Sequence, residues 1–403
     1  MKAGLRRGWR RGWVGGAAVA VAVAAGVMVG CTPLPGWLAT QGRAAIADFR
    51  PGVQAPIARA AAPSPLPAAP AALRWPGGLD TAGAEADLAA RGTVALLVAQ
   101  RGRLVYERYF DGFAADDIGN SFSMAKSVVS VLLGIAIDDG RIAGVDEPVT
   151  RYLPELRGND PRFDRITLRH LLAMRSGIAF DESYRSPFSD VARFYLGSDL
   201  KALVAGLRIE GDPDRLFRYQ SGDTQLLAMA IERAVGQPLA QFAEQRLWQP
   251  LGARHDASWS LDSRAGGVVL AFCCLNARAV DYLRFGLMVA ADGEWNGRRI
   301  VSRDWLRRST APQSGLPGPA DPAWRNIDRP HAAQAAFYAW QWRVRPLPAA
   351  RPLQPGSMVY AQGLLGQILL IDRDSQTVVL RLGRRQSDRH WPTWMDELVR
   401  LNR

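Results

Sequence analysis

The hydrophobic and polar residues of the chain are patterned differently at its two ends and in its middle. The stretch TVALLVAQRGRLVYERYF, residues 93–110, predicts two strands joined by a turn at residues 101–102. A similar unit, GQILLIDRDSQTVVLRLG, covers residues 366–383, with its turn at residues 372–376. We expect these strands from the two ends of the chain to share one antiparallel sheet.

Between these ends the pattern is mostly helical. One helix is expected to run to about Asp138 and to stop at Gly140, and its residues 128–137 are apolar almost all round, which is typical of a buried helix. Further helices are expected over residues 224–235 and after Pro238. The predicted fold class is therefore α+β, with an antiparallel sheet formed by the N- and C-terminal strands and a mainly helical lobe. A cleft between the two parts is the expected place for a site.

The N-terminus predicts export. A basic stretch, MKAGLRRGWRRGW, is followed by small apolar residues and then by Cys31. This order favours a lipoprotein-type signal peptide over residues 1–30 with Cys31 as the lipid attachment site, and an uncleaved anchor helix is the alternative. Residues 31–75, rich in Ala and Pro, are expected to form an extended tether, and residues 76–403 the folded domain. The expected location is the periplasmic side of a bacterial membrane.

The charge of the chain is concentrated outside the predicted domain. The net charge is +12, but residues 1–75 hold nine Lys and Arg against one acid, whereas residues 76–403 hold 41 against 37. The domain is therefore only mildly basic, and no basic run with interleaved aromatic residues occurs in it, so a nucleic-acid partner is not expected. Cys273 and Cys274 stand among apolar residues and are expected to be core residues without a disulfide.

The stretch NSFSMAKSVVS, residues 120–130, holds one of only three lysines in the chain. Ser123 and Lys126 are three residues apart, which places both side chains on one face of a helix. Asn120 or Ser121 is expected to cap that helix. Burial and the helix N-terminus disfavour an ammonium, so Lys126 is a candidate general base for a Ser123 nucleophile. Alone this spacing is a weak signal, because a capping Ser and a Lys that extends to solvent give the same letters.

A second element strengthens the hypothesis. Tyr219 and Ser221 lie in a short polar loop just before a helix, and a phenol beside a Lys can accept and return a proton. A Ser-His-Asp mechanism is poorly supported, because the chain has no G-x-S-x-G turn. A metal site is not expected either, because no H-x-x-H or H-x-x-x-H pair occurs. The four histidines are His170, His255, His331 and His390.

The order S-x-x-K, then Y-x-S about ninety residues later, then the strand AQGLLG resembles the penicillin-recognising serine hydrolases, which include the β-lactamases. Within that superfamily the chain looks most similar to 6-aminohexanoate-dimer hydrolases and family VIII esterases, over most of residues 90–385. The resemblance implies that Ser123 is the acylated nucleophile, that Lys126 deprotonates it, and that Tyr219 carries the proton to the leaving group.

The resemblance also implies a substrate-binding set. Ser221 stands where many relatives have Asn. The backbone N–H groups of Ser123 and Leu364 would form an oxyanion hole. Tyr184 matches a tyrosine that closes over amide substrates in the nylon-oligomer relatives.

The chain departs from this pattern at one strand. Ala361, Gln362 and Gly363 stand in place of Lys-Thr-Gly, whose Lys usually helps to hold a carboxylate. Ala361 carries no charge, so the sequence favours neutral esters or amides over β-lactams. Asp181 and Glu182 are candidates for binding a substrate ammonium, although loop carboxylates are usually solvated.

The function predicted from the sequence is that of a serine hydrolase which cleaves a small ester or amide through a covalent acyl-Ser123, without a metal or organic cofactor. Two alternatives remain at this point. One is a class C-type β-lactamase or D-Ala peptidase. The other is a non-catalytic protein that binds a cell-wall ligand on the same fold.

Overall fold

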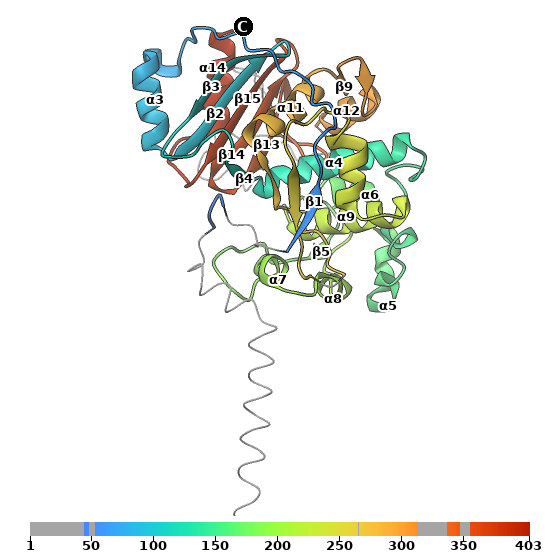
Figure 1. Ribbon diagram of the computed structural model, residues 1–403. Coiled ribbons are helices and arrows are strands. Elements are labelled where there is room, and N and C mark those ends of the chain that lie inside the picture. The colour runs from blue at the N-terminus through green and yellow to red at the C-terminus, as the bar shows by residue number, and fades with distance from the viewer. Residues whose placement is uncertain (1–43, 48–52, 265, 313–336, 347–354) are drawn as a thin grey trace, which may run out of the picture.

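A computed structural model describes residues 44–47, 53–264, 266–312, 337–346 and 355–403. Its main sheet has seven antiparallel strands in the order β11-β12-β13-β14-β15-β2-β3 (Figure 1). The prediction that strands from the two ends of the chain share one sheet is confirmed, because β15 pairs with β2. The strands are β2 (Thr93–Gln100), β3 (Arg103–Tyr109), β11 (Phe337–Tyr338), β12 (Arg343–Pro346), β13 (Pro355–Gly363), β14 (Gln367–Asp372) and β15 (Thr377–Gly383).

Helices cover both faces of this sheet. On the outer face, α14 (Trp391–Leu401) and α3 (Thr81–Ala90) bury apolar side chains against β2, β13, β14 and β15. On the inner face, α11 (Ala279–Ala290) packs against β14, β15 and β2. The central strands are therefore buried on both sides, which explains why β2 and β15 are almost continuously apolar instead of alternating.

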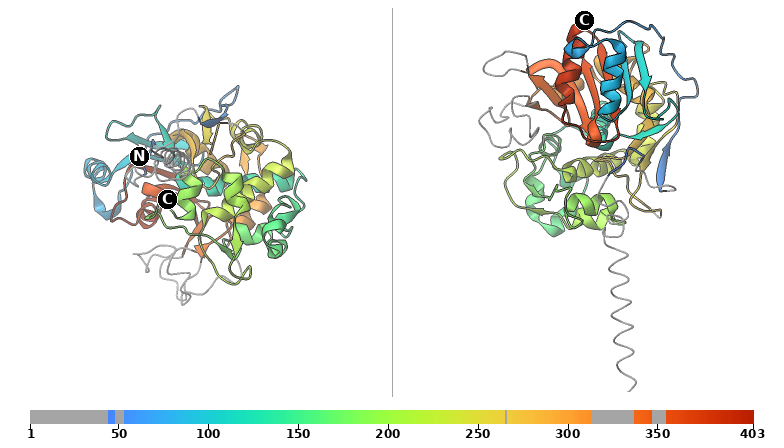
Figure 2. Two further views of the ribbon diagram at one scale, coloured as in Figure 1. Left: turned by 90° about the horizontal axis from the view of Figure 1, so that it is seen from below. Right: turned by 90° about the vertical axis from the view of Figure 1, so that its left-hand side faces the viewer.

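The rest of the body is the predicted helical lobe, which lies below the sheet in the right-hand view of Figure 2. Its central helices α4 and α9 pack against each other, and α6 packs against α9. The predicted α+β fold class is thus confirmed. The helices of this part and its neighbours are α4 (Ala125–Asp138), α5 (Leu156–Asn159), α6 (Leu168–Leu172), α7 (Asp190–Leu196), α8 (Leu200–Ala205), α9 (Ser221–Val235), α10 (Leu239–Ala243) and α12 (Arg303–Ser309).

Smaller sheets complete the architecture. A four-stranded antiparallel sheet has the order β1-β7-β8-β4, and two two-stranded sheets pair β5 with β6 and β9 with β10. The four-stranded sheet leads directly into the segment that holds Ser123, because β4 ends at Asn120. These strands are β1 (Gln54–Ile57), β4 (Ile118–Asn120), β5 (Ile178–Ala179), β6 (Arg208–Ile209), β7 (Ala257–Ser260), β8 (Leu275–Arg278), β9 (Glu294–Trp295) and β10 (Arg298–Arg299).

The predicted helix boundaries hold closely. Helix α4 ends at Asp138, two residues before Gly140, as expected. Helix α9 ends at Val235, where Gly236 adopts the left-handed conformation (φ 71°) that closes a helix. The start of α9 differs from the expectation, since it begins at Ser221 and not at Thr224.

The N-terminal part of the body differs from the expected tether. The sequence predicts an extended linker up to residue 75, but β1 pairs with β7, and residues 67–71 run along the edge of β3 with hydrogen bonds to its backbone. These Ala- and Pro-rich residues stay on the domain through their backbone N–H and C=O groups, which composition does not reveal. We call residues 53–75 the N-terminal strap.

The remaining predictions for the N-terminus concern residues that the structure does not describe. The signal peptide over residues 1–30 and lipid attachment at Cys31 both lie outside the described residues. Among the residues that are described, no helix combines the length and the apolar character needed to cross a membrane.

The expectation for the two adjacent cysteines is wrong in one respect. Both are buried, as predicted, but Cys273 and Cys274 form a disulfide with each other. Cys274 lies in the left-handed region with φ 69°. Adjacent cysteines rarely bridge in ordinary backbone conformations, so the pattern of letters alone argues against this bond.

Candidate active site

Ser123 lies in a tight turn between β4 and α4. The turn is a short 3-10 segment, Phe122–Met124, and Phe122 has the left-handed φ of 44°. Asn120 stabilises this conformation, because its Oδ1 accepts a hydrogen bond from the Phe122 N–H at 2.8 Å. Bulky residues rarely adopt such a φ, and strain of this kind is typical of functional turns.

The expected helix caps are therefore not formed. The side chain of Asn120 bonds to Phe122, and the hydroxyl of Ser121 donates to the Phe122 carbonyl at 3.1 Å. No side chain caps α4, which begins at Ala125, directly after the 3-10 turn. Ser123 is consequently held by the turn that precedes the α-helix, with its side chain partly exposed.

Lys126 is buried and its ammonium group is surrounded by acceptors. Its side chain is 2% exposed, so the alternative in which it extends to solvent is wrong. The Nζ atom lies 3.1 Å from Ser123 Oγ, 3.2 Å from Ser221 Oγ and 2.8 Å from the Phe272 carbonyl oxygen. Two fixed acceptors aim the nitrogen at the Ser123 hydroxyl, which is the geometry that a general base requires.

Tyr219 lies on the same small cavity. The Lys126 Nζ is 5.1 Å from the centroid of the Tyr219 ring, and the Arg343 guanidinium carbon is 5.3 Å from that centroid. Tyr338 meets the ring edge-on, with centroids 6.2 Å apart. The structure thus brings Ser123, Lys126 and Tyr219 together. The cavity is lined by Ser123, Lys126, Ser127, Tyr219, Tyr338, Gln341, Arg343, Tyr360 and Gln362.

The end of β13 lies against the turn that holds Ser123. A Cβ atom on Gly363 would lie 2.3 Å from the Ser121 carbonyl oxygen and 3.2 Å from the Ser123 nitrogen, so only glycine fits there. This close approach brings Leu364, the next residue, beside the Ser123 turn. Gln362 faces the cavity, and within the described part of the chain its buried Oε1 has no hydrogen-bond partner.

Glu182 connects the expected substrate-binding residues. Its Oε2 accepts from the Ser221 N–H at 2.7 Å, and its Oε1 accepts from the Ser221 hydroxyl at 2.8 Å and from the Tyr184 hydroxyl at 2.7 Å. Tyr184 is 52% exposed, so it stands at the rim of the site. The carboxylate that the sequence offered as an ammonium ligand is therefore engaged in holding Ser221 and Tyr184.

Asp223 is a buried carboxyl group beneath this site that the sequence reasoning did not identify. It is fully buried, and its Oδ1 accepts from Ser176 Oγ and from Gln220 Nε2, both at 2.6 Å. Burial raises the pKa of Asp223 to about 7, the two hydrogen bonds oppose that rise, and the Glu182 carboxylate adds to it. The Y-x-S-x-D spacing could have drawn attention to it, since Asp223 follows Ser221 on the first turn of α9.

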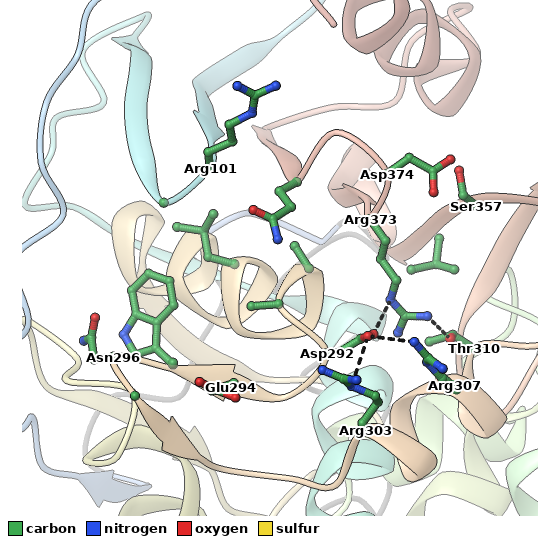
Figure 3. Close-up of a pocket in the computed structure, with 18 of the residues that line it drawn as sticks. Arg101, Asp292, Glu294, Asn296, Arg303, Arg307, Thr310, Ser357, Arg373 and Asp374 are labelled. Atoms are coloured by element: carbon green, nitrogen blue, oxygen red, sulfur yellow. Dashed lines mark hydrogen bonds and ion pairs between the residues drawn. The ribbon is translucent and has the colours of Figure 1, made fainter.

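A much larger cavity of about 1080 Å³ lies elsewhere, at the opposite end of the main sheet (Figure 3). It reaches Ser357 on β13, whereas the cavity that holds Ser123 reaches Gln362, roughly 17 Å further along the strand. Asp292 lies in it between Arg303, Arg307 and Arg373, with N–O distances of 3.5, 3.4 and 3.6 Å. None of the expected site residues lines this cavity, so size alone does not locate the chemistry.

In the part of the chain that the structure describes, no group of three or more His, Cys, Asp or Glu residues is placed to hold a metal ion. His170 has a structural role, because its Nδ1 accepts from the Thr167 N–H at 3.1 Å at the start of α6.

An antiparallel sheet backed by helices, joined to a helical lobe that presents a serine and a buried lysine, defines the β-lactamase class of folds. The chain matches the beta-lactamase family over residues 81–392 and therefore belongs to that family. Among solved structures, a class C beta-lactamase has a TM-score of 0.57 at 14% identity, covering 79% of this chain and 93% of the other.

Two characterised groups of relatives have the greatest bearing on function. The 6-aminohexanoate-dimer hydrolase of Paenarthrobacter ureafaciens is 28% identical over 312 residues, which cover 74% of this chain and 75% of that protein. Esterase EstB of Burkholderia gladioli is 31% identical over 187 residues, 40% of this chain and 46% of that protein. The structure of a putative 6-aminohexanoate-dimer hydrolase from Bacillus anthracis has a TM-score of 0.71 at 21% identity, covering 86% and 89% of the two chains.

Proposed function

We propose that this protein is a serine hydrolase that cleaves a small ester or amide through a covalent acyl-Ser123 intermediate. The observation that carries the proposal is the position of the buried Lys126 Nζ atom. It lies 3.1 Å from Ser123 Oγ and is held there by Ser221 and the Phe272 carbonyl. The similarity to an amide hydrolase and to an esterase supports the choice of substrates.

In acylation, Ser123 Oγ attacks the substrate carbonyl carbon and its proton passes to the neutral amine of Lys126. The negative charge on the carbonyl oxygen is stabilised by the backbone N–H groups of Ser123 and Leu364. The tetrahedral intermediate collapses with cleavage of the C–O or C–N bond. The leaving alkoxide or amine receives the proton from Lys126 through the Tyr219 hydroxyl, and this transfer completes the acylation.

In deacylation, a water molecule attacks the acyl-Ser123 carbonyl. Tyr219 accepts a proton from the water and relays it, through Lys126, to Ser123 Oγ as the ester bond breaks. The acid product leaves and Ser123 and Lys126 return to their starting states. Glu182 contributes by positioning, since it holds Ser221, which in turn accepts a hydrogen bond from Lys126.

The two alternatives make different demands on the site. A β-lactamase or D-Ala peptidase would use the same nucleophile and base, so only substrates distinguish it. A ligand-binding protein without activity gains nothing from a buried lysine beside a serine hydroxyl, because burying an ammonium costs free energy.

Labelling with a fluorophosphonate tests the central claim. We expect mass spectrometry to find the adduct on Ser123 in the wild-type protein and no adduct in Ser123→Ala. An unlabelled wild-type protein would disprove the proposal. Turnover of 4-nitrophenyl butyrate well above nitrocefin is expected for an esterase or amidase, and the reverse order would support a β-lactamase.

Amide cleavage has its own assay. Release of free amine from the 6-aminohexanoate dimer would establish amidase activity. Tyr184→Phe removes only the hydroxyl that donates to Glu182. We expect this variant to lose amide turnover while ester turnover is retained, as proposed for a tyrosine that closes over amide substrates.

A further inference from the structure

A further cavity, of about 640 Å³, lies between the N-terminal strap, β3 and the first two turns of α11. Cavities of this size are typical of sites for small molecules. Its lining residues come from separate segments of the chain and include four arginines, Arg59, Arg254, Arg278 and Arg284, against two carboxylates. In the part of the chain that the structure describes, the first three of these arginines form no ion pair. The cavity shares no lining residue with the one that holds Ser123, so it is a distinct site in which positive charge predominates.

Arg284 is the most deeply buried of these arginines, with a side chain that is only 2% exposed. Its Nε lies 3.3 Å from the Asp281 Oδ1, too poorly aligned for a hydrogen bond, and its Nη1 has no hydrogen-bond partner among the described residues. Arginine stays protonated in proteins, and a buried charged donor that is left unsatisfied costs free energy. An incompletely bonded guanidinium group on the wall of a cavity therefore points to a ligand that supplies acceptor atoms.

The carboxylate beside Arg284 is shared with other donors. Asp281 accepts from the backbone N–H groups of Arg254 and His255, at 2.8 and 3.1 Å, and its Oδ2 lies 2.9 Å from the His255 Nδ1. Burial lowers the pKa of Arg284, the Asp281 carboxylate opposes that shift, and the positive charge of Arg254 adds to it. Arg254 and Arg284 are therefore close enough to repel each other, and an anion between them would relieve this repulsion.

The lining of the cavity indicates which anion fits. A carboxylate fills the fork of one guanidinium group with its two oxygens. A phosphate monoester carries up to two negative charges and three acceptor oxygens, so it can bind several arginines at once. The cavity is also lined by the apolar side chains of Leu66, Leu104 and Val280. This combination fits a phosphate group that is attached to a small apolar group.

We propose that this cavity binds a small phosphate monoester, with the phosphate against Arg254, Arg278 and Arg284 and the organic group against the apolar lining. The site is independent of the chemistry proposed for Ser123. Arg59 and residues 63–66 of the N-terminal strap line the cavity together with residues of β3 and α11. A bound ligand therefore contacts both the strap and the body of the domain.

Titration calorimetry of the full chain tests the proposal with two probes, phenyl phosphate and inorganic phosphate. The ionic strength is kept constant with sodium chloride, because exposed arginines also attract anions without a defined site. We expect phenyl phosphate to bind with a Kd below about 1 mM. Inorganic phosphate should bind about tenfold more weakly, because it lacks the apolar contact of the ring. Equal affinities would assign the cavity to inorganic phosphate and overturn the choice of an ester.

Three variants locate the bound phosphate. Arg284→Met removes the buried guanidinium group and is expected to weaken binding of phenyl phosphate by about tenfold or more, the range of a charge-assisted hydrogen bond. Arg254→Met changes an exposed side chain, so its folding is not at risk, and should weaken binding by roughly fivefold. The matched control is Arg307→Met, which removes a guanidinium group paired with Asp292 in the large cavity. It is expected to bind phenyl phosphate as the wild type does.

Three results would overturn the proposal. One is a wild-type protein that shows no saturable binding of phenyl phosphate at concentrations up to about ten times the expected Kd. Another is an equal loss of affinity in Arg254→Met and Arg307→Met, which would reduce the effect to overall charge. The last is protection of Ser123 from fluorophosphonate labelling by phenyl phosphate, which would place the ligand in the cavity that holds Ser123. We expect unchanged labelling at saturating phenyl phosphate.

Discussion

The two cavities on the main sheet differ in the partners of their charged side chains. In the large cavity, the Asp292 carboxylate forms ion pairs with the guanidinium groups of Arg303, Arg307 and Arg373 (Figure 3). In the small one, Lys126 is buried among neutral acceptors and points at a hydroxyl. The larger cavity is lined by ion pairs, whereas the smaller one places a buried lysine beside a serine hydroxyl, which is the arrangement that the proposed mechanism requires.

The same contrast holds for two carboxyl groups. Asp292 has cationic partners in its cavity. Asp223, below the cavity that holds Ser123, has the neutral donors Ser176 and Gln220. Burial raises the pKa of the Asp223 carboxyl group to about 7.

Replacing Lys126, the proposed base in the small cavity, should have the largest effect. Lys126→Met keeps an unbranched side chain of similar length but cannot accept the Ser123 proton. We expect kcat/KM for 4-nitrophenyl butyrate to fall by roughly 10³-fold or more. Circular dichroism and thermal unfolding check that the variant folds. Activity within tenfold of wild type in folded protein would show that Lys126 is not the base.

The next largest effect concerns Asp223 and pH. Its pKa is raised from 3.8 to about 7 in the folded protein, so the folded state holds the proton more tightly than the unfolded state. The stability this provides is complete below pH 4 and is lost as pH rises through 7. Asp223→Asn resembles the protonated form and does not titrate. Between pH 5 and 8 we expect its free energy of unfolding to gain roughly 3 kcal/mol relative to wild type.

Denaturant titrations at both pH values measure that gain. The second oxygen of Asp223 has no partner among the described residues, so an amide nitrogen can occupy its place. If the difference between the two proteins is the same at pH 5 and pH 8, Asp223 does not titrate in this range.

Tyr219→Phe should have a smaller, substrate-dependent effect. The ring keeps its contacts with Tyr338 and Arg343, but the hydroxyl that is proposed to protonate the leaving group is lost. An amine leaving group needs that proton and 4-nitrophenolate does not. We therefore expect a loss of about 10²-fold for an amide and a clearly smaller loss for the nitrophenyl ester. Equal losses on both substrates would argue against the proton-transfer role.

The smallest effect is expected in the large cavity. Arg307→Met removes an exposed guanidinium group from Asp292, which keeps Arg303 and Arg373. Because exposed ion pairs contribute little, we expect activity within about threefold of wild type and stability within about 1 kcal/mol. A tenfold loss of activity, measured on the same ester, would mean that the two cavities are functionally connected.

The sequence predicted the elements whose patterns are local. The hairpins at both ends were recognisable from apolar runs around turns, and α4 from its fully apolar surface. Ser123, Lys126 and Tyr219 were found because their spacing matches a known family. The α9 start was placed late because the polar residues Ser221 to Asp223 look like a loop, although they are held by buried partners.

The features that the sequence did not predict depend on contacts between distant segments. Arg343 carries no motif, and only the pairing of β12 with β13 brings it to the site. Glu182 was predicted only as a possible ammonium ligand, and its bonds to Ser221 and Tyr184 depend on the fold of the 178–190 loop. The left-handed conformation of Phe122, in the turn directly after β4, has no signal in the sequence either. The bond between Cys273 and Cys274 requires an unusual backbone conformation that neither residue type reveals.

The N-terminal strap also determines how far the chain can be shortened from its N-terminus without exposing a sheet edge. Strand β1 occupies the free edge of β7, and residues 67–71 occupy the free edge of β3. Unpaired sheet edges invite pairing with other molecules. A chain trimmed to residue 76 would expose both edges at once and should self-associate, whereas one that begins before Gln54 should remain monodisperse.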